Sequence, residues 1–384
     1  PYVLRYGRRY LREMPLYPLP TDLPELQRQN MQTLLATSVF GRPLCGPAFS
    51  AAADGGARPK RVLELACGSA YWTSLCAEYL ARGRGERDVT FVGVDVVQLA
   101  PDLSRQGIRW RFVRHDLRKV PLPFDDGDFD LVMMKDLSWV MPIGLPSQRL
   151  LDECIRVLRP GGTLEVWETD HVVRSLAPHP PPTPSGQAGR RAEDDRCAAQ
   201  TATFPISPAT PFTTAHNGFL QDANAWIQDA LDRRKLPPTP CTRVSQMLLQ
   251  EPESLTDIDC RRVAVPLGEP RWEQAEGVAT GTRSRKNSEA GAGAGAGAVG
   301  GGGVGAGTRA AKSLLTEEQQ ALRHLALLNV VQKIESLEPL LKEVSGKNQE
   351  EWQRWWSWMM ADLLENKGAS SGECLELGAW WARK

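Results

Sequence analysis

The fold is decided by two short stretches, RVLELACGSAY over residues 61–71 and GVD over residues 93–95. The first predicts a buried strand, a turn of small residues and a helix that begins near Tyr71. The second ends another apolar strand on the carboxylate of Asp95. A strand, tight turn, helix and acid-ended strand are typical of a nucleotide-binding half of a doubly wound sheet. Ligands of such sheets lie beyond the carboxyl ends of the strands.

The same alternation continues outward along the chain. We expect strands near 61–66, 89–94, 109–113, 129–134 and 162–168, with helices near 71–82, 98–105 and 146–158. Strands separated by helices indicate a parallel sheet covered on both faces. A sixth strand near 259–267 and a seventh near 373–383 would complete an α/β, doubly wound, seven-stranded Rossmann-like sheet.

Four segments follow from the composition. Residues 1–58 form a lead-in with a helix near 24–39, and residues 59–270 form the core, with a Pro-rich insert at 177–211 that is expected to be a loop or partly disordered. A helix is expected near 216–235. A Gly/Ala-rich tract at 271–313 buries too little apolar surface to order itself and is expected to be disordered. Residues 314–384 return to helices, near 314–338 and 349–365, and to the last strand.

Charge and cysteine usage narrow the class of protein. The chain has 46 basic and 46 acidic residues, so no global field favours nucleic acid or an anionic membrane. Its eight cysteines show no Cys-x-x-Cys spacing, which favours reduced thiols inside the cell and no metal site. No apolar run reaches the roughly 18 residues of a membrane span. The start at Pro1 suggests a trimmed N-terminus.

The motifs resemble those of class I S-adenosylmethionine-dependent methyltransferases. VLELACGSA at 62–70 looks like their first motif, and GVD at 93–95 looks like their second acidic position. HDL at 115–117 and LRPGG at 158–162 resemble the segments around the third and fifth strands. The lead-in sequence YPLPTD at 17–22, followed by Glu25 and Arg28, is similar to the LaeA-like group of fungal methyltransferases.

The resemblance implies S-adenosylmethionine as cofactor and assigns its contacts. The implied cofactor-binding residues are Glu64, Ala66, Cys67, Gly68, Asp95, Val96, Asp116, Leu117 and Lys135. Asp95 would hold the ribose hydroxyls, Asp116 the adenine amino group, and Glu64 the ammonium of the cofactor. The family's turn usually carries two or three glycines, whereas this chain has only Gly68.

Two residues after strand ends are candidates for a catalytic base. Asp136 follows the fourth strand and His171 follows the fifth. Lys135 could instead orient an anionic substrate. Each of these residues, taken alone, is more typical of a structural role.

Two functions from different classes agree with these patterns. The first is a methyltransferase for a small-molecule acceptor, at oxygen or nitrogen, of the kind that acts in secondary metabolism. The second is a cofactor-binding regulator of the LaeA type that works through protein partners in the cytoplasm or nucleus. A nicotinamide dehydrogenase is disfavoured because the 66–70 turn lacks the three spaced glycines of the dinucleotide motif.

Overall fold

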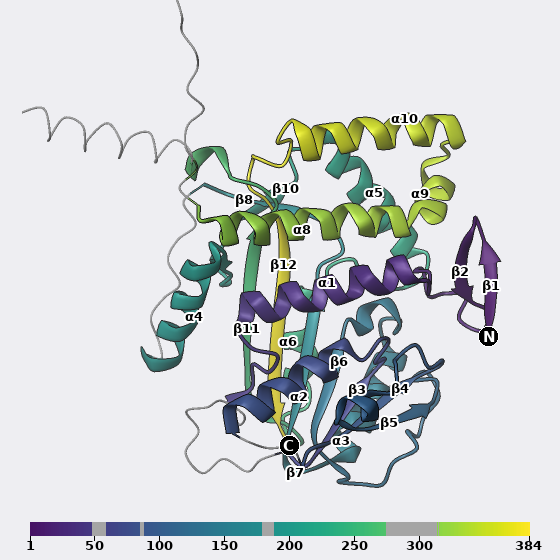
Figure 1. The fold of residues 1–384 in the computed structure, drawn as a ribbon, viewed down its shortest axis with the longest axis vertical. Helices are drawn as coiled ribbons and strands as arrows, with labels where there is room; N and C mark the ends of the chain where they lie inside the picture. Colours follow the sequence, from purple (N-terminus) through teal and green to yellow (C-terminus); the bar gives the residue numbers. More distant parts are fainter. Residues whose placement is uncertain (48–58, 85–87, 179–187, 274–312, 314) are drawn as a thin grey trace, which may run out of the picture.

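The structure is a computed structural model that describes residues 1–47, 59–84, 88–178, 188–273, 313 and 315–384 (Figure 1). The strands of its main sheet are β3 (Arg61–Leu65), β4 (Thr90–Asp95), β5 (Arg109–Arg114), β6 (Phe129–Lys135), β7 (Leu158–Thr169), β8 (Arg174–Leu176), β9 (Phe204–Pro205), β10 (Phe212–Thr214), β11 (Thr256–Pro266) and β12 (Glu373–Arg383). A separate hairpin is formed by β1 (Tyr2–Arg5) and β2 (Arg8–Leu11).

The centre of the sheet is parallel. Strand β3 lies between β4 and β6, β5 is the edge beyond β4, and β7 follows β6. The chain then returns antiparallel, because β12 pairs with β7 and β11 pairs with β12. The expected doubly wound Rossmann-like sheet is confirmed, and β8, β9 and β10 extend the seven expected strands to ten.

Helices cover both faces of the sheet. Their bounds are α1 (Leu23–Phe40), α2 (Tyr71–Arg84), α3 (Leu145–Val157), α4 (Ala188–Thr201), α5 (Gly218–Asp232), α6 (Val244–Leu249), α8 (Glu317–Ser336), α9 (Glu338–Ser345) and α10 (Gln349–Met360). Because side chains alternate along a strand, Val62 joins the core beneath α1, α2 and α8, whereas Leu63 joins the core beneath α3 and α6. In Figure 1, α1 and α8 run side by side across the sheet.

Two expectations from the sequence are wrong. The helix expected near 98–105 is only a short 3₁₀ turn, η2 (Leu103–Gln106), capped by Asp102, because Pro101 and Gly107 bracket it. The insert 177–211 contains helix α4, since residues 188–201 are rich in Ala and Arg and contain no proline.

Local chemistry explains where several helices begin and end. Asp22 caps α1 by accepting from Glu25 N, and Gly41 ends that helix in the left-handed conformation. Thr316 and Gln319 form a reciprocal capping box at the start of α8. The expected Gly/Ala-rich disordered tract lies almost wholly outside the described residues, and the segment boundaries remain a prediction.

Candidate cofactor and active site

The turn after β3 has an unusual backbone. Ala66, Gly68 and Ala70 all have positive φ, of 50°, 50° and 55°. Residues with a side chain adopt this left-handed region only at an energetic cost, whereas glycine adopts it without that cost. Two alanines therefore hold the conformation of a three-glycine turn, which the sequence alone did not reveal. Hydrogen bonds from Cys67 N to Val94 O (3.0 Å) and from Ala70 N to Cys67 O (2.7 Å) secure it.

Asp95 lies directly opposite this turn. Its Oδ2 accepts from Gly68 N at 2.9 Å, and its Oδ1 accepts from Val96 N at 2.7 Å. Each carboxylate oxygen has two lone pairs, so one on each oxygen is left for a diol. Burial raises the pKa of Asp95 to about 6, against the lowering effect of the backbone donors.

A groove joins the carboxyl ends of β3, β4, β5 and β6. Two adjoining hollows, of about 90 and 330 Å³, share Val96, Val97 and His115, together with Leu11 and Met14 of the lead-in. Of the residues assigned from the resemblance or as a candidate base, seven line the first hollow: Ala66, Gly68, Asp95, Val96, Leu117, Lys135 and Asp136.

The lead-in forms the opposite wall of the groove, which sequence reasoning missed. Tyr17, Arg28, Gln29 and Gln32 all line the first hollow. Tyr17 accepts from Gln29 Nε2 at 3.3 Å, and burial raises the pKa of its phenol far above the ordinary value. The only signal in the sequence was the apolar spacing of α1, which says that the helix packs but not where.

Three assigned residues lie outside the first hollow. Glu64 is buried beneath the turn and accepts from Thr73 Oγ1 at 2.5 Å; burial raises its pKa to about 7. Cys67 is buried, and burial raises the pKa of its thiol. Asp116 lies in the adjoining hollow, where two hydrogen bonds from Arg118 (2.8 and 2.9 Å) lower its pKa.

Lys135 and Asp136 form the end wall near β6. Lys135 Nζ lies 2.6 Å from Asp136 Oδ2, and Gln32 Nε2 donates to Asp136 Oδ1 at 2.8 Å. Asp136 has a positive φ of 53°, so its backbone turns sharply as β6 ends. The carboxylate is thereby held toward the groove by partners from two elements.

His171 lies away from the groove lining. It is buried, its ring stacks on Trp139 at 3.7 Å, and its Nε2 lies 3.0 Å from Ser138 Oγ. Burial, with Lys333 and Arg28 nearby, lowers its pKa well below the ordinary value. A neutral, enclosed imidazole in this position does not reach a substrate in the groove, so the geometry disfavours His171 as a base.

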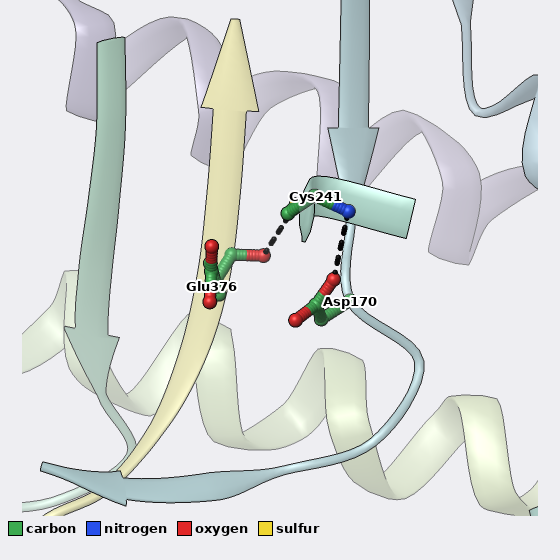
Figure 2. A group of neighbouring side chains, drawn as sticks. All are labelled: Asp170, Cys241 and Glu376. Atoms are coloured by element: carbon green, nitrogen blue, oxygen red, sulfur yellow. Dashed lines mark hydrogen bonds between the residues drawn. The ribbon is translucent and has the colours of Figure 1, made fainter. Parts of the chain in front are cut away.

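One cluster of possible metal ligands occurs in the described part of the chain (Figure 2). It contains Asp170, Cys241 and Glu376, with Cys241 N donating to Asp170 Oδ1 at 3.0 Å. Arg174 and Arg262 both pair with the Glu376 carboxylate, and burial raises the pKa of the Cys241 thiol. Two guanidinium groups already neutralise the acids, so the cluster is an ion-pair network rather than a metal site.

The groove fits S-adenosylmethionine. A side chain added at Gly68 would find only Gln29 Oε1, at 3.6 Å, so the backbone there is open to close approach. Asp95 has lone pairs for two ribose hydroxyls, and Leu117 and Val96 offer apolar surface on either side. The adjoining hollow by Asp116 continues in the direction of β5.

Comparison with known proteins supports this reading. Residues 62–162 match the family model described as "Methyltransferase domain". The chain is 34% identical over 125 residues to the phthiotriol/phenolphthiotriol dimycocerosates methyltransferase of Mycobacterium tuberculosis (strain ATCC 25618 / H37Rv), which is 29% of this chain and 42% of that protein. It is 35% identical over 113 residues to the corresponding methyltransferase 1 of Mycobacterium ulcerans (strain Agy99), 27% of this chain and 36% of that protein.

The chain thus spans less than half the length of these relatives. Similar solved structures include the phosphoethanolamine N-methyltransferase 2 of Haemonchus contortus with S-adenosyl-L-methionine: 12% identity, TM-score 0.34, covering 92% of this chain and 57% of that one. Another is a plantazolicin methyltransferase with SAH: 9% identity, TM-score 0.36, covering 94% and 87%. Scores this low carry no inference about substrate. The family match and the groove together show that the chain contains a class I S-adenosylmethionine-dependent methyltransferase domain.

Proposed function

We propose that this protein transfers a methyl group from S-adenosylmethionine to a small-molecule acceptor, at oxygen or nitrogen. The observation that carries the proposal is the groove in which Gly68, Asp95 and Leu117 line the ends of three adjacent strands and face Asp136. When bound, the cofactor supplies a methyl carbon on a positively charged sulfur, open to in-line attack by an acceptor lone pair.

The chain's own residues provide alignment and a dry pocket. Asp95 accepts from the ribose hydroxyls, and Gly68 allows the backbone to approach the amino-acid end. Tyr17, Gln29 and Trp139 cover the groove and exclude water. These roles, like those of Val96 and Leu117, remain proposals that the binding experiment below addresses.

Asp136 is the better placed of the two candidate bases. It lines the groove, whereas His171 is enclosed behind Trp139. Its bonds from Lys135 and Gln32 orient the carboxylate toward the groove, where it can accept a proton from an acceptor hydroxyl or ammonium. Lys135 is then a positioning residue for Asp136 rather than a contact to the cofactor.

The second candidate is a cofactor-binding regulator of the LaeA type that works through protein partners. It rests on the lead-in resemblance and on the β1–β2 hairpin, where Leu4 and Tyr6 are 76% and 79% exposed. Such apolar side chains on a projecting hairpin suit a protein contact. A cytoplasmic or nuclear location belongs to this proposal as well. No helix in the described ranges has the length and apolar character to cross a membrane.

Calorimetric titration with S-adenosylmethionine tests the cofactor assignment. We expect one site per chain in the wild type, and a loss of about 10–100-fold in affinity for Asp95→Ala, because hydrogen bonds to a charged group are removed. Gly68→Val should abolish binding, since the new side chain fills the approach at a positive φ. Asp102→Ala, on an exposed turn, is the matched control. No heat with the wild type, or unchanged affinity in both groove variants, would contradict the assignment.

A labelling experiment separates enzyme from regulator. The protein is incubated with methyl-labelled cofactor and a metabolite extract, and labelled small molecules are sought. A labelled product that disappears in Asp136→Asn, while cofactor affinity is kept, supports an enzyme that uses this carboxylate. Tight cofactor binding without any product in repeated extracts would favour the regulator.

A further inference from the structure

A second cavity, of about 400 Å³, opens at the carboxyl ends of β6 and β7 on the face covered by α3 and α6. This volume is within the roughly 300–1,000 Å³ usual for small-molecule sites. The 3₁₀ turn η3 (Leu137–Trp139) separates it from the cofactor groove. Leu137 and Ser138 line the second cavity, whereas Trp139 lines the groove. The two spaces are therefore distinct.

The walls and mouth of this cavity are largely apolar. Met134, Leu150, Val166 and Val244 form its sides. At its mouth Ile143 is 39% exposed, and beside it in the chain Leu145 is 62% exposed. Large apolar side chains left in water beside a cavity indicate a ligand with an apolar body.

Glu168 is the one acid among the residues that line the cavity, whose other polar side chains include Ser147, Gln148, Gln246 and Gln250. Glu168 is buried, and its Oε1 accepts from Ser138 N at 2.9 Å. Its Oε2 lies 2.6 Å from Ser138 Oγ, which in turn lies 3.0 Å from His171 Nε2. No ion pair joins Glu168 to a lysine or arginine in the described part of the chain. Serine occupies the middle of this chain of hydrogen bonds, so the group lacks the serine–histidine–acid order of a hydrolase.

Two neighbouring charges act on Glu168 in opposite directions, and the effect of Asp136 is larger than that of Lys135. From the end of β6, Asp136 disfavours its ionisation and Lys135 favours it. His171 is held neutral by burial, and the Cys241 thiol, whose Sγ lies 3.4 Å from Glu168 O, is held protonated. Gly378, opposite Glu168 on β12, brings no charge. The exposed Arg243 stands at the mouth. The carboxyl is thus buried at the end of an apolar cavity with no cation of its own.

We propose that this cavity binds a small amine with an apolar body, whose ammonium group pairs with the Glu168 carboxylate. Burying an unpaired carboxylate is costly, and a ligand cation supplies the missing charge. An anionic ligand would meet a second acid, and a neutral one would leave Glu168 protonated, without the gain of an ion pair. The proposal is independent of methyl transfer, because binding is measured without the methyl donor.

Binding should release a proton from the protein. Burial, followed by the Asp136 charge, raises the pKa of Glu168 to about 8, so the group is mainly protonated near neutral pH. Pairing with an ammonium favours the carboxylate, and the proton lost by Glu168 passes to the buffer. Affinity for an amine should therefore rise as the pH is raised from about 6 to about 8.

Isothermal titration with three ligands of equal chain length tests this. Octylamine, octanoate and octanol are titrated into the full chain near neutral pH, in two buffers of different ionisation enthalpy. We expect octylamine to bind with release of about one proton per site and the other two to bind at least tenfold more weakly. Equal binding of octanol, or tighter binding of octanoate at Arg243, would overturn the proposal.

Two variants complete the test. Glu168→Gln keeps an oxygen for Ser138 N and a donor for Ser138 Oγ, so it should fold, yet it should lose at least tenfold in octylamine affinity and all proton release. Met247→Trp, which narrows the cavity at its partly exposed wall and leaves Glu168 intact, should also lose binding. Unchanged octylamine affinity in both variants, or displacement of octylamine by S-adenosylhomocysteine, would place the amine elsewhere and overturn the proposal.

Discussion

The two halves of the molecule satisfy their buried polar groups over different distances along the chain. In the parallel half, β3 to β6, Gly68 and Asp95 are 27 residues apart and Thr73 and Glu64 are 9 apart. In the C-terminal half, meaning β7, β11 and β12 with α8 and the α1 helix packed on it, Arg174 and Glu376 are 202 residues apart. The α1–α8 contact from Arg28 to Asn329 spans 301 residues.

This difference separates local from long-range chemistry. In the parallel half the partners lie closer in the chain, although the bond from Lys60 N to Asp130 Oδ2 still spans 70 residues. The motifs at 62–70 and 93–95 therefore indicate most of the site from the sequence. In the C-terminal half the partner of a charged residue inside a strand lies far away in the chain. The sequence near such a residue therefore does not show how its charge is neutralised. The variants below measure how strongly each half depends on contacts between residues that are near or far apart in the sequence.

The largest effect is expected for Arg28→Ala. Arg28 and Glu25 form a buried ion pair (2.6 Å), and Ser336 of α8 donates to Glu25 Oε2 at 2.7 Å. Removal of the guanidinium leaves a buried carboxylate without a counter-charge, so the free energy of unfolding should fall by about 3–5 kcal/mol. Urea denaturation measures the change.

Two controls accompany that variant. The double variant Glu25→Leu/Arg28→Met removes both charges and should be far less destabilised than Arg28→Ala. Arg82→Ala, which breaks an exposed pair with Glu78 in α2, should change the free energy by no more than about 0.5 kcal/mol. If Arg28→Ala behaved like Arg82→Ala, the buried Glu25–Arg28 pair would not stabilise the fold.

In the parallel half, Gly93→Ala should destabilise through overpacking. A side-chain carbon there would lie 1.9 Å from Trp110 Cη2 and 2.8 Å from Cys67 Sγ. We expect a loss of about 1–3 kcal/mol, with weaker cofactor binding because Cys67 lies in the turn. Gly218→Ala, where nothing lies within 4 Å, is the matched control and should be nearly neutral. Thermal unfolding of both variants gives the comparison.

The buried acid of the C-terminal half predicts a pH dependence. Glu168 stays protonated up to about pH 8 when folded, whereas in the unfolded chain it ionises near its ordinary pKa of 4.5. Between these values Glu168 binds more protons in the folded chain than in the unfolded one, so its contribution to stability is greatest below about pH 4.5 and is lost as pH rises toward 8. The stability difference between the wild type and Glu168→Gln should shrink by up to about 1.4 kcal/mol per pH unit.

Denaturant titrations of both proteins between pH 5 and 8 test this slope. Shifts of other groups, such as Asp170 and His171, are common to the two proteins and cancel in the difference. If the free energies of unfolding of the wild type and the variant changed with pH in parallel, Glu168 would ionise at its ordinary pKa in the folded chain.

The smallest effect concerns the turn itself. Ala66 holds a positive φ of 50°, so Ala66→Gly should relieve backbone strain and stabilise the fold by about 1 kcal/mol. Ala77→Gly, within α2, should instead destabilise by about 1 kcal/mol. If both substitutions lowered the unfolding temperature, the turn at Ala66 would not be strained.

Prediction from sequence succeeded where pattern and contact are local. The strands from β3 to β7 lie within a few residues of their expected bounds, because apolar runs and the turns between them are encoded side by side. Helix α4 was not predicted because the prolines near residue 180, which oppose helix formation, precede it within the same insert. The walls supplied by Tyr17 and Gln32 were missed because nothing near position 17 or 32 says which surface α1 covers.

The sequence by itself determined the strands from β3 to β7, the turn at 66–70 and the acid at Asp95, since each depends on residues close together in the chain. Only the tertiary structure decided that Ala66 and Ala70 adopt the backbone of glycines, that His171 is enclosed behind Trp139, and that Glu168 ends a second cavity. Burial, counter-charge and enclosure are properties of the surroundings, and those surroundings come from segments up to 311 residues apart, as from Glu25 to Ser336.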